Sequence, residues 1–217
     1  MDLKIVDLGL VDFNYAWAKQ KELFQEVKSG SLDKALIICR HNPVITAGRG
    51  AKDSNILASE AELKNRGVAL YKIDRGGDVT YHGPGQLTAY PVFNLNYLKK
   101  DIHWFLRYLE GIVIRSLDYF GIKGEQRCGL TGVWVGKRKI ASIGIAIRNW
   151  VTFHGLSINI KNEDLANFSL IRPCGMDIML TSVERETGNN ICMDDFKDKF
   201  INALKLSTGE YLAEKVS

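Results

Sequence analysis

The feature that most constrains the fold is a glycine-rich segment that runs directly into an apolar strand. Residues 75–86 read Arg-Gly-Gly-Asp-Val-Thr-Tyr-His-Gly-Pro-Gly-Gln, and residues 87–93 read Leu-Thr-Ala-Tyr-Pro-Val-Phe. β-Branched and aromatic residues on both sides are typical of strands. Paired glycines let a backbone approach a ligand closely and expose N–H groups to an anion. A tight hairpin, in which the glycines only supply turn geometry, is the alternative, and the segment alone favours neither.

Strand and helix patterns of both kinds surround this segment. Short apolar runs predict strands near residues 4–10, 35–39, 44–47, 68–73, 133–135, 140–147 and 150–160. Helix N-caps are expected at Asp12, Ser59 and Asp101, and a last helix begins near Asp194. The clearest helix, after Asp101, places seven apolar residues on one buried face: Ile102, Phe105, Leu106, Leu109, Val113, Leu117 and Phe120. Such a mixture predicts an α/β (α+β) fold with a mixed β-sheet flanked by helices, not a doubly wound sheet.

Length and composition limit the protein class. The 217 residues contain no linker-like run, so we expect a single domain over residues 1–217. A hydrophobic fraction of 46% and a charged fraction of 25% are typical of soluble globular proteins. The sequence shows neither a membrane span nor a targeting segment, which predicts a cytoplasmic protein. The net charge of +4 slightly favours acidic partners over nucleic acid.

Cysteine and histidine spacing argues against metal and disulfide chemistry. Residues Cys39, Cys128, Cys174 and Cys192 form no close pairs, and with no secretory signal they are expected to be thiols. The four histidines make no metal-ligand spacing with them, and the sequence contains no phosphate-binding P-loop. We therefore expect neither a metal nor a cofactor.

Two residues stand out as candidates for chemistry. Cys174 lies between Pro173 and Gly175, outside any periodic apolar pattern, which suits either an accessible nucleophile or a small packing residue. Lys139 leads into the strand 140–147, where a solvated edge charge is the usual alternative. A lysine cation beside a thiol favours the thiolate, whereas a neutral lysine accepts a proton from an amine. The sequence leaves open which state dominates.

Several histidines and tyrosines also have two readings. Tyr81, His82, Tyr90 and His154 suit either ligand contact or a structural hydrogen bond, and for His41 the structural reading is favoured.

Four motifs together resemble the octanoyltransferases of lipoate biosynthesis. They are Arg-Gly-Gly-Asp-Val-Thr-Tyr-His-Gly-Pro-Gly-Gln-Leu at 75–87, Gly-Val-Trp-Val-Gly with Lys-Ile-Ala-Ser-Ile-Gly between 132 and 144, Val-Thr-Phe-His-Gly-Leu-Ser-Ile-Asn at 151–159, and Arg-Pro-Cys-Gly at 172–175. The match extends over roughly residues 34 to 185. It implies the fold shared by lipoate-protein ligases and the catalytic domain of biotin-protein ligases. The segment before Val133, with Arg127-Cys128, departs from the family pattern and leaves the role of Cys128 open.

The resemblance implies specific site residues. Cys174 becomes the acyl-accepting nucleophile and Lys139 its acid/base partner. The residues implied to bind the acyl substrate are Arg75, Gly76, Gly77, Tyr81, His82, Gly83, Ala141, Ser142, Ile143, Gly144, His154, Gly155 and Leu156.

The resemblance also implies a reaction and partners. An octanoyl group moves from octanoyl-acyl carrier protein to a lysine of a lipoyl domain, as in 2-oxoacid dehydrogenase E2 subunits or the glycine-cleavage H protein. We expect a monomer that binds neither nucleic acid nor membrane. Alternatives are an amidotransferase that moves octanoyl between lipoyl domains, an ATP-dependent lipoate-protein ligase, and a non-catalytic binder of these partners.

Overall fold

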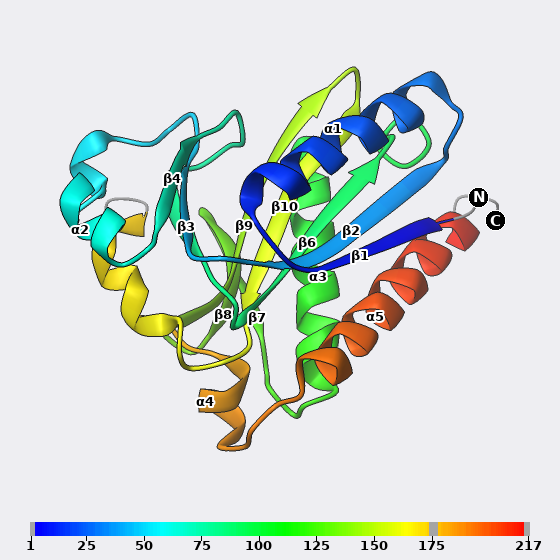
Figure 1. The fold of residues 1–217 in the computed structure, drawn as a ribbon. Coiled ribbons are helices and arrows are strands. Elements are labelled where there is room, and N and C mark those ends of the chain that lie inside the picture. Colours follow the sequence, from blue (N-terminus) through cyan, green and yellow to red (C-terminus); the bar gives the residue numbers. More distant parts are fainter. Residues whose placement is uncertain (1–2, 174–177, 215–217) are drawn as a thin grey trace.

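The computed structural model describes residues 3–173 and 178–214, and within them ten strands form two sheets (Figure 1). The large sheet has the order β1 (Leu3–Val11), β2 (Lys34–His41), β6 (Gln86–Phe93), β10 (Val151–Asn159), β9 (Arg138–Arg148), β8 (Leu130–Val135) and β7 (Glu125–Arg127). The small sheet has the order β4 (Ala69–Lys72), β3 (Val44–Ala47) and β5 (Val79–His82). The pairs β1–β2 and β3–β4 are parallel and the others antiparallel, which confirms the predicted mixed sheet.

The helices begin and end largely where their capping residues predict. They are α1 (Phe13–Ser29), α2 (Glu60–Asn65), α3 (Ile102–Asp118), α4 (Val183–Thr187) and α5 (Met193–Glu214), with 3₁₀ turns η1 (Asp53–Asn55) and η2 (Leu165–Leu170). Ser59 and Asp101 accept the expected hydrogen bonds from the backbone N–H groups of Glu62 and Trp104. Asp12 stands at the N-cap of α1 without a side-chain bond to the helix, and its carboxylate instead accepts a hydrogen bond from Asn42 Nδ2 at 2.6 Å.

The continuous apolar run in β2 is explained by helices on both faces of the large sheet. Leu36 and Ile38 belong to the core that includes α3 and α5, whereas Ala35, Ile37 and Cys39 pack in the core under α1. Alternate residues of a strand face opposite sides, so each face of β2 is apolar. Figure 1 shows α1 on one face and α3 with α5 on the other, with the small sheet and α2 beside them.

The apolar stripe of α3 does not serve one purpose along its length. Phe105, Leu109 and Val113 are fully buried in the core against the large sheet, as predicted. The prediction was wrong for Ile102, which is 46% exposed and, with Leu106, lines a pocket. Periodicity identifies a shared helix face, but it does not show where the covering sheet ends.

The glycine-rich segment, residues 75–86, crosses between the two sheets. β5 pairs with β3 in the small sheet, whereas β6 pairs with β2 and β10 in the large sheet, so residues 83–85 do not close a hairpin between β5 and β6. Asp164 holds the crossing: its carboxylate accepts hydrogen bonds from Gly85 N at 2.6 Å and from the Tyr81 hydroxyl at 3.2 Å. The preceding loop, residues 75–78, therefore lies at the junction of the sheets. Among the helices described, none is long and apolar enough to cross a membrane.

The division of α3 can be tested by two alanine substitutions one turn or more apart. We expect Leu109→Ala to lower the free energy of unfolding by about 2–5 kcal/mol, because it leaves a cavity in the core. Ile102→Ala should change it by about 0.5 kcal/mol or less, because that side chain is largely exposed. Urea denaturation measures both, and equal losses would contradict this division of the helix.

Candidate active site

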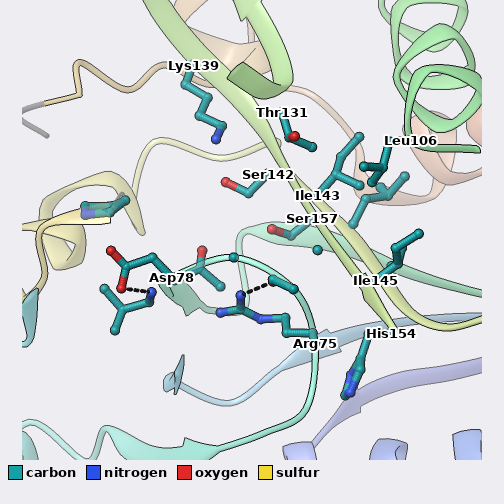
Figure 2. Close-up of a pocket in the computed structure, with 18 of the residues that line it drawn as sticks. Arg75, Asp78, Leu106, Thr131, Lys139, Ser142, Ile143, Ile145, His154 and Ser157 are labelled. Atoms are coloured by element: carbon teal, nitrogen blue, oxygen red, sulfur yellow. Dashed lines mark hydrogen bonds between the residues drawn. The ribbon is translucent and has the colours of Figure 1, made fainter. Parts of the chain in front are cut away.

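A pocket of about 410 Å³ lies at the junction of the two sheets. Its wall comes from the 75–78 loop, from β5, β8, β9 and β10, and from the first turns of α3. Eleven of the residues expected in the site line it: Arg75, Gly76, Gly77, His82, Lys139, Ser142, Ile143, Gly144, His154, Gly155 and Leu156. Figure 2 shows Lys139 across the pocket from Leu106, Arg75 and His154. Segments distant in sequence thus share one cavity.

Arg75 is built into the pocket wall by the small sheet. Its guanidinium is almost fully buried and donates from Nη2 to the Thr46 carbonyl oxygen at 2.6 Å and from Nη1 to the Gly76 carbonyl oxygen at 3.0 Å. A Cβ on Gly48 would lie 2.8 Å from Arg75 Nη1. Gly48, directly after β3, therefore leaves room for the Gly77 carbonyl oxygen and for Arg75, which was not foreseen.

Two paired glycines allow close contacts at this wall, and one of them, Gly144, meets the 75–78 loop. Gly144 of β9 and Gly155 of β10 are register partners. A Cβ on Gly144 would lie 2.9 Å from the Gly76 carbonyl oxygen, and one on Gly155 would collide with the Ala89 carbonyl oxygen. The bare backbone lets Gly76 N–H donate to the Ile145 carbonyl oxygen at 2.8 Å. The sequence pattern suggested that small residues here would let a ligand lie close, whereas the group that lies against Gly144 is the 75–78 loop itself.

His82 is a buried, neutral imidazole at the pocket wall. Gln86 donates from Nε2 to the Tyr81 carbonyl oxygen at 3.2 Å, so its Oε1 accepts from His82 Nδ1 at 3.3 Å. Burial is the main cause that lowers the pKa of His82 well below its ordinary value, and the neighbouring His41 acts in the same direction. A proton on Nδ1 leaves Nε2 as a hydrogen-bond acceptor.

His154 has a strained backbone and a carboxylate partner. Its φ of 58° lies in the left-handed region, and its backbone N–H donates to Gln20 Oε1 at 2.8 Å. Its Nε2 donates to Asp74 Oδ1 at 2.9 Å, and Arg148 donates to the other oxygen of Asp74 at 2.8 Å. Burial lowers the pKa of His154, and the bond to Asp74 offsets only part of that effect. The pair fixes the imidazole orientation.

Lys139 is not the solvated edge charge that its sequence position also suggested. It is 7% exposed, and its Nζ lies 5.5 Å from the centre of the Trp134 ring. Its backbone N–H donates to the Met179 carbonyl oxygen at 2.8 Å, and its carbonyl oxygen accepts from Thr181 N–H at 3.0 Å. Lys139 is therefore held between β8 and the segment that begins at Ile178.

Cys174 and Gly175 lie outside the described residues. Pro173 and Ile178, the described residues on either side of that gap in the sequence, both line the pocket. The other cysteines are free: Cys39 is buried, which raises the pKa of its thiol, while Cys128 and Cys192 are exposed. In the described part of the chain, no group of three His, Cys, Asp or Glu side chains is arranged to hold a metal ion.

Three residues expected in the site lie beside the pocket instead of lining it. Tyr81 is fully buried, donates to Asp164 and accepts a hydrogen bond from Asn167 at 2.9 Å. A Cβ on Gly83 would collide with the Asp164 carboxylate, and Ala141 belongs to the core that includes α3. These three positions pack against Asp164 or in the core, although their neighbours in the same motifs reach the cavity.

Some pocket residues were missed by the sequence analysis. They include Leu106, Leu130, Thr131, Ile145 and Ser157. Ser157 follows Gly155 by two positions on β10, and this period of two provided a usable signal. For Leu106 the signal was misleading, because its helical spacing matched that of core residues.

Comparison with known proteins points in one direction. A family model described as lipoyl protein ligase A/B catalytic domain matches residues 12–205. A protein named octanoyltransferase from Thermoanaerobacter sp. (strain X514) is 41% identical over 97% of this chain and 92% of its own length. Another, from Geotalea uraniireducens (strain Rf4), is 42% identical over 90% of this chain and 88% of its own.

Solved structures share the fold at low sequence identity. Lipoate-protein ligase A bound with ATP superimposes with a TM-score of 0.76 at 16% identity, over 96% of this chain and 86% of that chain. Biotin protein ligase from Aquifex aeolicus, in complex with biotin and ATP, gives a TM-score of 0.61 at 11% identity, over 97% and 72% respectively. These confirm the expected ligase-like catalytic-domain fold.

Because buried imidazoles resist protonation, we expect the free energy of unfolding to fall in mild acid. His41 donates from Nδ1 to the Val11 carbonyl oxygen and accepts from the Tyr90 hydroxyl, and burial lowers its pKa from 6.5 to about 4. Below pH 6.5 the His41 imidazole is protonated in the unfolded chain but stays neutral in the folded protein. The contribution of His41 to the free energy of unfolding is therefore complete above pH 6.5 and is lost as the pH falls. His41 alone should cost about 2 kcal/mol at pH 5.

Urea denaturation at pH 7.5 and pH 5 measures the loss, and imidazole NMR signals identify its source. The His41 ring resonances should stay unchanged from pH 8 to pH 5.5. A midpoint near 6.5 for those resonances would refute the prediction.

Proposed function

The chain belongs to the octanoyltransferases of the lipoyl protein ligase A/B family, which act in protein lipoylation, and we propose that it transfers octanoyl from acyl carrier protein to a lipoyl-domain lysine through Cys174. The pocket carries this proposal. It combines aliphatic walls at Leu106 and Ile143 with Lys139 on the opposite side, and Pro173 and Ile178 line it next to the segment that contains Cys174. Its volume of about 410 Å³ is in the range of small-molecule sites, about 300–1,000 Å³.

In the first step the Cys174 thiolate attacks the carbonyl carbon of the carrier thioester. A bond forms between Cys174 Sγ and the acyl carbon, the carrier C–S bond breaks, and the carrier leaves as a thiolate that takes up the proton of the Lys139 ammonium. One thioester replaces another, so the free-energy change is small. Backbone N–H groups of the glycine-rich segment are suited to stabilise the tetrahedral oxyanion.

In the second step the lipoyl-domain lysine attacks the acyl-enzyme. Its amine nitrogen bonds to the acyl carbon, the bond to Sγ breaks, and the amine loses a proton to Lys139 directly or through water. Forming an amide from a thioester runs downhill, so the route consumes no ATP. As a cation, Lys139 also favours the Cys174 thiolate. The two steps therefore need Lys139 in two protonation states in turn.

The pocket wall supplies orientation for this chemistry. Arg75 and the 75–78 loop are fixed by bonds to Thr46 and to the Ile145 carbonyl oxygen, which keeps the backbone N–H groups of the loop in place. The neutral imidazole of His82 adds no charge beside the acyl chain. A substrate held in its reactive orientation reacts faster, because binding has already met the entropy cost of orienting it. Acyl carrier protein and lipoyl domains, as acidic proteins, suit the net charge of +4.

Intact-mass measurement tests the covalent step. Incubation with octanoyl-acyl carrier protein should add one octanoyl group to the protein, and peptide mapping should locate it on Cys174. Cys174→Ala should lose both the adduct and the transfer, whereas Cys128→Ala should retain both, since Cys128 is exposed and was assigned no role.

Undiminished turnover in Cys174→Ala would overturn the covalent route. Activity that requires ATP and free octanoate would favour the ligase reaction of the structural relatives. Transfer from an octanoylated lipoyl domain, with none from acyl carrier protein, would favour an amidotransferase.

Removing Lys139 tests its role in proton transfer. We expect Lys139→Ala to slow transfer by about 10²–10⁴-fold, the usual contribution of general acid–base catalysis. Its melting temperature should stay close to that of the unchanged protein, because the side chain lies at the pocket and not in the apolar core. Lys137→Ala, at an exposed turn two residues earlier, is the matched control. Global unfolding of Lys139→Ala, as seen by circular dichroism, would count against this assignment.

A further inference from the structure

A buried carboxylate outside the pocket lining lies behind Lys139. Glu110, in the middle of α3, is fully buried. Its Oε1 accepts a hydrogen bond from Gly132 N–H at 2.8 Å, and its Oε2 accepts one from Arg107 Nη1 at 2.6 Å. Burying a carboxylate is costly, and a buried ion pair can often be replaced as a whole by well-packed apolar residues with no loss of stability. Stability alone does not explain a glutamate here.

The partner of Glu110 has a backbone conformation that demands glycine. Gly132 has φ +125°, outside the regions that residues with a side chain normally adopt. The pairing of β8 with β9 also shifts register immediately after it, between Val133 and Trp134. The hydrogen bond from Gly132 to Glu110 fixes this irregular stretch from the side of α3. A backbone bond to a charged acceptor is about twice as strong as a neutral one.

Gly132 is the surface on which the Lys139 side chain rests. A Cβ on Gly132 would lie 2.5 Å from Lys139 Cε and 3.1 Å from Lys139 Nζ. The same Cβ would lie 2.6 Å from the Ala141 carbonyl oxygen. Trp134, on the same strand, lies beside the Lys139 ammonium, and Thr131, directly before Gly132, lines the pocket. The position of the Lys139 side chain relative to the pocket therefore depends on where the Gly132 backbone lies and how it is oriented.

We propose that Glu110 is a positioning residue that acts through Gly132 to direct the Lys139 ammonium into the pocket. The inference rests on the proposed role of Lys139 in octanoyl transfer. Glu110 does not line the pocket. It holds the Gly132 N–H, Gly132 supports the last methylenes of Lys139, and the main chain of Lys139 is held by Met179 and Thr181.

Two glycine substitutions separate this role from a general effect of added bulk. Gly132→Ala should lower the rate of the aminolysis step by about 10- to 100-fold, since a displacement of about 1 Å has effects of that size. The KM for acyl carrier protein should stay within about twofold, because Gly132 does not line the pocket. Gly111→Ala, in α3 beside Glu110, meets no atom within 4 Å and should keep the full rate. Equal rates in the two variants would overturn the proposal.

Substitutions of Glu110 distinguish positioning from stability. Glu110→Gln retains an oxygen that accepts from Gly132 N–H and should keep most of the rate. Glu110→Leu fills the space without an acceptor, so the unpaired Gly132 N–H should lower its melting temperature, and its rate, measured at a temperature where it is fully folded, should fall about tenfold or more. A full rate in the folded Glu110→Leu protein would mean that Glu110 is only structural.

A readout independent of transfer separates this inference from the proposed function. Acetylation of Lys139 by a small N-hydroxysuccinimide ester, measured by peptide mass spectrometry, reports whether the ammonium has left its 7% exposed site. We expect several-fold faster labelling in Gly132→Ala and Glu110→Leu than in Glu110→Gln and Gly111→Ala. That result supports positioning even if octanoyl transfer fails, and uniform labelling would contradict it.

Discussion

The shape of the pocket depends on one hydrogen bond, made where a glycine leaves the backbone without a side chain. Gly76 N–H donates to the Ile145 carbonyl oxygen at 2.8 Å, which ties the loop before β5 to the large sheet, while Arg75 in the same loop is bonded to Thr46 of the small sheet. This approach is possible only because Gly144 lacks a side chain. The two sheets are joined at this loop, and the cavity between them takes its shape from the joint. The glycine-rich segment therefore links the two sheets, and this link places it in the pocket wall.

The charge of the pocket-lining side chains depends on their burial as well as on residue type. Burial lowers the pKa values of His82 and His154, so both are neutral near pH 7. Arg75 has its guanidinium directed at carbonyl oxygens of the wall. Lys139 stands apart, across the cavity from this group. The histidines therefore add no charge to the wall, and the charge of Arg75 faces the carbonyl oxygens of Thr46 and Gly76.

Much of this arrangement could be predicted from the sequence, and the failures have physical causes. The apolar run of β2 and the caps at Ser59 and Asp101 are local signals, and the structure confirms them. Eleven of the residues expected in the site line the pocket, and the related octanoyltransferases confirm the family. Ile102 was misplaced because periodicity does not reveal the edge of a sheet. The short elements β7 and α4 were missed because three to five residues are too few to show a period. The link from Glu110 to Lys139 through Gly132 joins three elements and has no local signature.

The crossing of the chain between sheets has a consequence for how the protein folds. β6 pairs with β2, about fifty residues earlier, and with β10, about seventy residues later, so the wall of the pocket is made from contacts of high sequence separation. Loop closure on that scale makes folding slow compared with a helical bundle. During synthesis, β6 and the glycine-rich segment emerge well before β9 and β10 exist to cover them. A nascent chain therefore exposes an apolar strand for that interval and gains its acyl pocket only after most of the chain has been made.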